Sequence, residues 1–179
     1  YALVKKDGQS LVLKYDIGSD STPKLVKKIK TGSCDDDDVL SVCIAGESDS
    51  NNDEESVAVR IGNKIKIVNS SSGVTGMKFK IKSKDADTYT RTNTKTATSA
   101  ALEVSSDGGL IIASTSNALH IFAGSGTGPR SGSSPDKNKS ASARSSIGMA
   151  KIPNATKVYI HTIQSGKEYI VSCCSNDVD

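Results

Sequence analysis

Short apolar runs separated by turn residues recur along the chain, and the clearest example spans residues 99–122. Two turn sequences, Ser106-Asp107-Gly108-Gly109 and Ser116-Asn117, separate apolar runs at 101–104, 110–115 and 118–122. Asp-Gly and Asn supply the positive φ angles that tight hairpin turns need. The pattern therefore predicts three antiparallel strands joined by two turns.

The same signals predict further strands at 2–4, 11–15, 24–29, 39–45, 56–61, 64–68, 77–81, 157–161 and 168–174. In 77–81 apolar residues alternate with lysines, which is typical of a half-buried strand at a sheet edge. No segment has the apolar spacing of a useful helix, and the nearest approach, 144–151, is short and interrupted by Gly148. The predicted fold class is all-β, with antiparallel sheets.

Comparison of the chain with itself shows that these strands repeat. Residues 8–13 align with 62–67, which align with 116–121, and both offsets are 54 residues. The repeat predicts equivalent antiparallel hairpins over 54–68 and 108–122. Their turns are expected at Gly62-Asn63 and at Ser116-Asn117.

Each repeat unit is predicted to contain four strands, and the last unit is incomplete. The units are expected at residues 1–32, 39–84 and 99–163, with the start of a further unit at 157–179. Within the third unit, residues 124–147 are rich in Gly, Ser, Pro and Lys and have no apolar periodicity. That segment is predicted to be a flexible insertion.

Residues 99–122 resemble a blade of the WD-repeat family in their order of strands, Ser-Asp-Gly turn and closing aromatic residue. The Trp-Asp dipeptide of that family is replaced by Phe122-Ala123 and Val68-Asn69, with Tyr15-Asp16 near its place, and no Gly-His pair precedes any unit. The resemblance implies a partial β-propeller of about three four-stranded blades. A β-sandwich or barrel would satisfy the same alternation and is the alternative.

Composition determines which residues can build the core. Apolar residues make up 35% of the chain, with no Trp and only two Phe, so the core must consist mainly of aliphatic side chains. Alternation predicts that eight of them are largely buried, namely Val57, Val59, Ile65, Ile67, Leu110, Ile112, Leu119 and Ile121. The segments around Asp49 and Asp136 contain too few apolar residues to offset the entropy of ordering, and we expect them to be poorly packed.

The charge is distributed unevenly, although the formal net charge is only +3. Residues 35–55 contain nine acids and no base, so the rest of the chain carries +12. The acids at the start of this stretch are Asp35, Asp36, Asp37 and Asp38. They are interpreted either as a solvated loop or as a docking site for a basic partner.

The insertion is the second candidate for partner binding. Its basic residues are Arg130, Lys137, Lys139 and Arg144. Flexible basic segments contact phosphates through charge alone, which makes RNA a candidate partner, although a solvated loop is the alternative. The insertion has no aromatic residue on which bases could stack.

No motif predicts catalysis, a cofactor or a metal site. His120 and His161 lie in predicted strands, and nothing places either beside a cysteine nucleophile. The Gly-rich residues 124–131 lack the lysine and the following helix of a phosphate-binding loop. The four cysteines match no zinc spacing, and we expect them to be reduced in a cytosolic or nuclear chain. No apolar run is long enough to span a membrane, and no signal peptide is visible.

Two hypotheses of function follow from these observations. The first is a non-catalytic scaffold or interaction subunit of a larger intracellular assembly, nuclear or cytoplasmic, including a ribonucleoprotein. Its partners would be protein subunits and RNA, without a cofactor, a membrane or a small-molecule substrate, and analogy of fold is its only support. The second is an extracellular or enzymatic all-β module whose functional residues lie outside this stretch, with its Asn-X-Ser/Thr sequons glycosylated.

Overall fold

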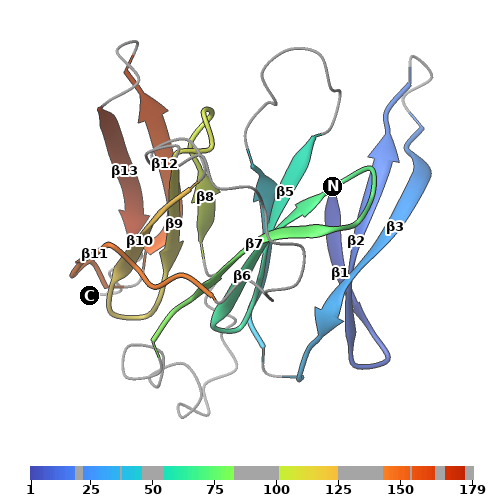
Figure 1. Cartoon of the computed structure of the whole chain (residues 1–179), viewed down its shortest axis with the longest axis horizontal. Helices are drawn as coiled ribbons and strands as arrows, with labels where there is room; N and C mark the ends of the chain where they lie inside the picture. Colours follow the sequence, from blue (N-terminus) through green and yellow to red (C-terminus); the bar gives the residue numbers. More distant parts are fainter. Residues whose placement is uncertain are drawn as a thin grey trace, which may run out of the picture.

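The computed structural model describes residues 1–18, 22–36, 38–45, 55–82, 101–124, 143–153, 155–163 and 168–175. Every regular element in these ranges is a β-strand, and the 13 strands form four antiparallel sheets (Figure 1). The predicted all-β fold class is therefore confirmed. The segments around Asp49 and Asp136, which the composition predicts to be poorly packed, lie outside the described residues.

The strands follow the chain from sheet to sheet. The first sheet contains β1 (Ala2–Lys6), β2 (Gln9–Asp16) and β3 (Lys24–Ser33). The second contains β4 (Leu40–Ile44), β5 (Ser56–Ile61), β6 (Lys64–Asn69) and β7 (Thr75–Lys80). The third contains β8 (Leu102–Val104), β9 (Leu110–Ser114), β10 (Leu119–Ala123) and β11 (Gly148–Ala150). The fourth contains β12 (Ala155–Thr162) and β13 (Tyr169–Ser175). Within every sheet, strands that are consecutive in sequence lie side by side.

Neighbouring sheets pack face to face, so the apolar core is divided among three seams. The first seam, between the first and second sheets, buries Val12, Ile29, Val57, Val59 and Val68. The second seam, between the second and third sheets, buries Ile65, Ile67, Phe79, Ile111 and Phe122. The third seam, between the third and fourth sheets, buries Ile112, Leu119, Ala155 and Val158. Each sheet between two seams is therefore buried on both of its faces.

The predicted core is largely correct. Six of the eight aliphatic residues predicted to be buried are buried, whereas Leu110 and Ile121 are half-buried against the third seam. In the second seam the rings of Phe79 and Phe122 meet edge to face, with their centroids 5.6 Å apart. This edge-to-face geometry is favoured by the ring quadrupoles.

The two predicted hairpins are confirmed as antiparallel pairs. Ile61 pairs with Lys64 across the turn at Gly62-Asn63, and Ser114 pairs with Leu119 across a turn that contains Ser116-Asn117. Gly62 has a φ of 53°, which suits the first position of a two-residue hairpin turn with glycine.

The strands predicted at 2–4 and 11–15 pair around a turn at Asp7-Gly8, but the alignment of 8–13 with 62–67 is one residue out. Lys6 pairs with Gln9, so this turn consists of Asp7 and Gly8, whose φ angles of 51° and 69° favour a tight primed turn. Because side chains alternate, a shift of one residue exchanges the two faces of a strand. Ser10 and Val12 are accordingly buried, and their neighbour Leu11 is only half-buried.

The predicted insertion is too long at its C-terminal end. Arg144 pairs with Phe79 in an isolated parallel bridge. The Lys80 N–H donates to the Arg144 carbonyl at 3.0 Å, and the Arg144 N–H donates to the Lys78 carbonyl at 2.8 Å. Residues 143–147 thus connect the edge of the second sheet to β11, a strand too short to show alternation. The third sheet ends at Ala150. The alignment assigned residues 155–162 partly to the third unit, but these residues belong to the fourth sheet.

Candidate functional site

The acidic run forms a turn that connects the first sheet to the second. The Asp35 N–H donates to the Asp38 carboxylate at 2.8 Å, and the Asp38 N–H donates to the Asp35 carbonyl at 3.2 Å. Asp36 forms an ion pair with Lys5, which lowers the pKa of Asp36 and raises that of Lys5. Asp37 lies outside the described residues. The described aspartates therefore have local structural partners, and docking of a basic protein here stays a prediction.

The candidate basic residues of the insertion are mostly beyond the described part of the chain. Arg130, Lys137 and Lys139 lie outside it, whereas Arg144 is described and has an exposed side chain. Its backbone is held by the edge of β7, as shown above. Within the described residues, no hydrogen bond or ion pair joins Arg144 to the acidic turn.

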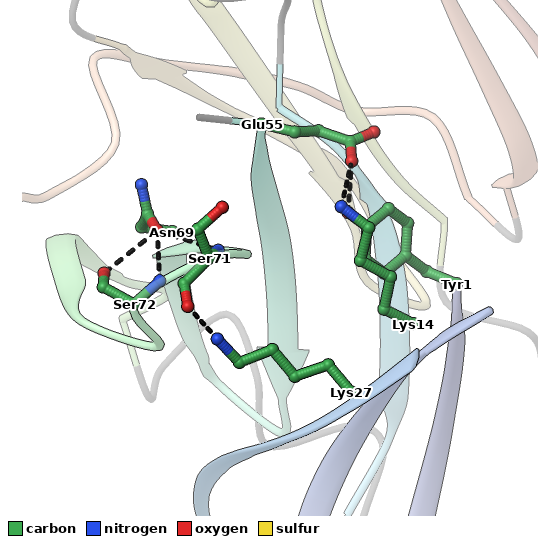
Figure 2. Close-up of polar contacts among 7 residues, drawn as sticks. All are labelled: Tyr1, Lys14, Lys27, Glu55, Asn69, Ser71 and Ser72. Atoms are coloured by element: carbon green, nitrogen blue, oxygen red, sulfur yellow. Dashed lines mark hydrogen bonds and ion pairs between the residues drawn. The ribbon is translucent and has the colours of Figure 1, made fainter. Parts of the chain in front are cut away.

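A cluster of polar side chains closes one end of the first seam (Figure 2). The Glu55 carboxylate, just before β5, accepts hydrogen bonds from the Tyr1 hydroxyl and, at 3.3 Å, from the Lys14 ammonium. The Lys14 nitrogen also lies 5.7 Å from the centroid of the Tyr1 ring, a cation–π distance. The hydrogen bonds with Tyr1 and Glu55 raise the pKa of Lys14 despite partial desolvation.

A second contact crosses the same seam. The Lys27 ammonium of β3 donates to the Ser71 carbonyl, in the turn between β6 and β7 (Figure 2). That turn is shaped by Asn69, whose side-chain oxygen accepts from the backbone N–H groups of Ser71 at 2.9 Å and Ser72 at 2.6 Å. Such Asx turns fix a tight loop without regular secondary structure. The basic groups of the first sheet therefore help to hold the second sheet against it.

The third seam is closed by a comparable contact. The Tyr169 hydroxyl donates to Asp107 at 2.7 Å, and Asp107 also accepts from the Ser105 hydroxyl and the Gly109 N–H. Burial alone would raise the pKa of Asp107, but these hydrogen bonds outweigh it and hold that pKa below its usual value. The same contact raises the pKa of Tyr169. The Ser-Asp-Gly turn that the sequence singled out is thus a contact between sheets.

Three strands carry an excess of positive charge that the sequence reasoning missed. The strands β3, β6 and β7 contain eight lysines and no acidic residue. These residues are Lys24, Lys27, Lys28, Lys30, Lys64, Lys66, Lys78 and Lys80. The alternation of lysine with apolar residues in Lys64–Ile67 and Met77–Lys80 was the available signal, but it does not show that the two runs become neighbours.

Four of these lysines form two cross-strand pairs on one face. Lys64 lies directly opposite Lys80, and Lys66 lies directly opposite Lys78. Lys66 also reaches across the first seam and donates to the Thr31 carbonyl at 2.6 Å. Burial and the neighbouring Lys78 and Lys64 lower the pKa of Lys66. Like charges directly opposite each other in a sheet are destabilising, so this arrangement has an electrostatic cost.

The two histidines show no catalytic arrangement among the described residues. His120 is buried in the second seam with its Nε2 3.3 Å from the Thr115 hydroxyl oxygen, whereas the side chain of His161 is exposed. Arg60 is buried in the same seam and donates to the Gly62 carbonyl at 2.9 Å and to the Ser114 carbonyl. These contacts join the second and third sheets and give the buried polar groups structural roles.

The cysteines are free within the described part of the chain. Burial and the nearby Glu103 raise the pKa of Cys43 to about 12, so this thiol stays protonated and is a poor nucleophile. Across the described ranges, no group of three or more His, Cys, Asp or Glu residues is placed to hold a metal ion. Nor do those ranges contain a helix long and apolar enough to cross a membrane.

Comparison with known proteins adds no assignment. No protein-family model matches the sequence, and no curated protein matches it significantly.

Proposed function

We propose that this chain is a non-catalytic scaffold built as part of a β-propeller similar to WD-repeat proteins. The observation that supports it is the placement of the first strands of consecutive sheets. β4 contacts β8, and β8 contacts β12, while the later strands of each sheet follow outward in sequence order. Propeller blades are four-stranded sheets arranged in this manner around a central channel.

The contacts at the strand ends agree with that arrangement. Ser106, which follows β8, lies 3.3 Å from Thr162 at the end of β12, measured between the hydroxyl oxygens. The C-terminal ends of the first strands of the third and fourth sheets therefore lie close together. A sandwich of two facing sheets, the alternative architecture, would not produce a series of three seams between four consecutive sheets.

A scaffold binds partners through loops and faces while its core stays rigid. Among the described residues, the polar side chains of Arg60 and Asp107 have partners that join sheets. The exposed lysines of β3 and β7 supply charged surface groups that suit contacts with other macromolecules. An intracellular assembly of proteins, with RNA as a further partner, is the setting we propose.

The test of this proposal uses the native assembly isolated from cells that express the full-length protein. A variant with Arg130, Lys137, Lys139 and Arg144 replaced by Ser should associate more weakly and with a flatter salt dependence, because fewer charged contacts remain. The fold should be unchanged, because Ser at position 144 keeps the backbone bonds to β7. If association and its salt dependence are unchanged, the insertion is a solvated loop. The basic insertion is then not the contact between this protein and its assembly.

A thiol titration separates this proposal from the extracellular alternative. The protein is isolated from its native source, denatured without reductant and treated with Ellman's reagent. We expect free thiols at Cys34, Cys43, Cys173 and Cys174, since intracellular proteins keep cysteines reduced. Treatment with a glycosidase should not change the mass of the protein. A disulfide, or a glycan on the Asn69-Ser70-Ser71 sequon, would favour the extracellular module instead.

A further inference from the structure

We propose that the face formed by Lys64, Lys66, Lys78 and Lys80 binds the phosphate backbone of nucleic acid, independently of base sequence. This lysine face is separate from the insertion, and neither the repeat pattern nor the scaffold proposal requires it. It is assembled by the pairing of β6 with β7, which brings together two runs that are distant from the candidate basic residues in sequence.

The four lysines share one face of the second sheet. Lys66 lies opposite Val59, and Lys64 lies opposite Ile61, and both of these β5 residues belong to the core of the first seam. Residues directly opposite each other in antiparallel strands project on the same side. The lysines therefore extend the first-seam face of the sheet outward, from its apolar centre to its edge strand.

The charges on this face are not neutralised by the described chain. Its two ion pairs are Lys5 with Asp36 and Lys14 with Glu55, and neither includes a residue of the lysine face. Lys64 and Lys80 are exposed, and Lys66 and Lys78 are half-buried. Two adjacent pairs of like charges weaken the sheet unless an anion neutralises them. A bound polyanion would remove that repulsion.

The spacing suits a chain of charges rather than a single small anion. Lysines two residues apart on a strand are separated by about 6.8 Å, which follows from the rise of an extended chain. Opposite lysines on neighbouring strands are about 5 Å apart at their Cβ atoms. The four lysines thus start from a two-by-two array of backbone positions, from which their side chains can contact consecutive charged groups along a polymer.

Phosphate polymers fit this array better than an acidic peptide. A peptide would gain most of its affinity by adding a strand at the edge of β7. Arg144 already occupies that edge, through the hydrogen bonds with the Lys80 N–H and the Lys78 carbonyl. Phosphate contacts require only positioned charge, and lysine serves as a point charge for phosphate. The residues on this face include no aromatic side chain for base stacking, so the binding does not read sequence.

The experiment measures binding of a fluorescein-labelled oligouridylate of about 15 nucleotides by fluorescence anisotropy, with the full chain, from about 50 to about 200 mM KCl. The test variant is Lys64→Thr/Lys78→Thr/Lys80→Thr, which leaves the hydrogen bond from Lys66 in place. The matched control is Lys24→Thr/Lys28→Thr/Lys30→Thr, which removes the same charge from exposed positions on β3. Thermal melts establish that both variants are folded.

We expect the test variant to bind at least tenfold more weakly at about 100 mM salt, with a salt slope shallower by about 2, because each lost contact with single-stranded phosphate removes about 0.7. The control should lose little affinity. Equal losses in the two variants would show that binding follows net charge, and unchanged binding in the test variant would also overturn the proposal. A labelled polyglutamate that binds as tightly as the RNA would overturn the choice of phosphate.

If the triple variant does not fold, Lys80→Glu replaces it, because this side chain is exposed and at the edge of the sheet. Its charge reversal should reduce RNA affinity at least threefold relative to Lys28→Glu. Failure of this test does not affect the scaffold proposal, since the latter is tested by association with the native assembly through the insertion.

Discussion

In the central strands of this protein, side chains on both faces of the sheet are buried, because each face packs in a seam. All residues of β5 after Ser56 are buried, including the charged Arg60. Alternation of apolar and polar residues consequently disappears in this strand, and the polar side chains that remain must find partners inside. Arg60 does so by donating to backbone carbonyls of its own turn and of the third sheet.

The first prediction at this scale concerns core packing. Ile67→Ala should lower the free energy of unfolding by ~2–5 kcal/mol, because it leaves a cavity in the second seam. Ile121→Ala should cost less, because Ile121 is half-buried. Urea denaturation measures both, with Val26→Ala, at a position 60% exposed, as the control. A loss below about 0.5 kcal/mol for Ile67→Ala would show that this residue is not packed in the core.

The second prediction concerns Asp107 and pH. Its pKa is lowered in the folded state, so its contribution to stability is present above its unfolded pKa and is lost as the pH falls through the folded pKa. The wild-type protein should therefore lose stability between about pH 5 and pH 2, and Asp107→Asn should lose less over the same interval. Urea melts at several pH values measure the difference. Parallel curves for the two proteins would rule out the proposed role of this carboxylate.

At the level of elements, the edge of β7 is protected by a segment that is distant in sequence. An exposed strand edge can pair with other chains, and proteins cover or charge such edges. Here both devices occur, because Lys78 and Lys80 carry charge and the backbone of Arg144 forms hydrogen bonds with the same residues. The connection from 143 to 147 thereby ties the insertion to the second sheet.

This arrangement predicts a difference between two substitutions at one position. Arg144→Pro removes the N–H that donates to the Lys78 carbonyl, whereas Arg144→Ser keeps it. We expect the amide hydrogen of Lys80 to exchange about tenfold faster in Arg144→Pro than in Arg144→Ser. A tenfold change corresponds to about 1.4 kcal/mol in the free energy of opening, which is near the upper end of the net contribution of one hydrogen bond. Hydrogen exchange followed by mass spectrometry measures this. Equal rates in the two variants would mean that the bridge does not protect the edge.

In the whole molecule, stability is distributed over three seams that have similar construction. Each seam combines an apolar centre with polar contacts, such as Tyr1 with Glu55 in the first and Tyr169 with Asp107 in the third. Because the seams occur in series, each sheet is stabilised mainly by the sheet or sheets next to it. The proposed propeller would extend that series, since repeated units of this kind bury their faces only by stacking.

The prediction at this scale concerns proteolysis. Limited digestion of the isolated protein should cut first around Asp49 and around Asp136, because these segments have few apolar residues to offset the cost of about 1–2 kcal/mol per residue for ordering the backbone. Mass spectrometry of the first fragments identifies the sites. First cuts in the hairpin turns at Gly62 or Gly108 would contradict the expectation.

The sequence by itself determined the strands, most of their turns and the all-β class, because alternation and turn chemistry are local properties of the chain. It placed the hairpins around Gly62 and Asn117 correctly for that reason. It could not find β11, because three residues are too few to show a period. It also aligned the first hairpin with the second one residue out of step, since apolar Leu11 and Val12 are both plausible core residues in isolation.

Only the tertiary structure decided which faces meet and which charges become neighbours. Ser10 is buried and Leu11 is only half-buried because of how the first sheet packs on the second. The local sequence pattern does not predict this. The lysine face depends on pairing between β6 and β7, and the edge contact of Arg144 depends on a chain segment that returns after more than sixty residues. Such contacts are set by the packing of distant segments, because period-two alternation specifies that a strand has two faces but not what each face will touch.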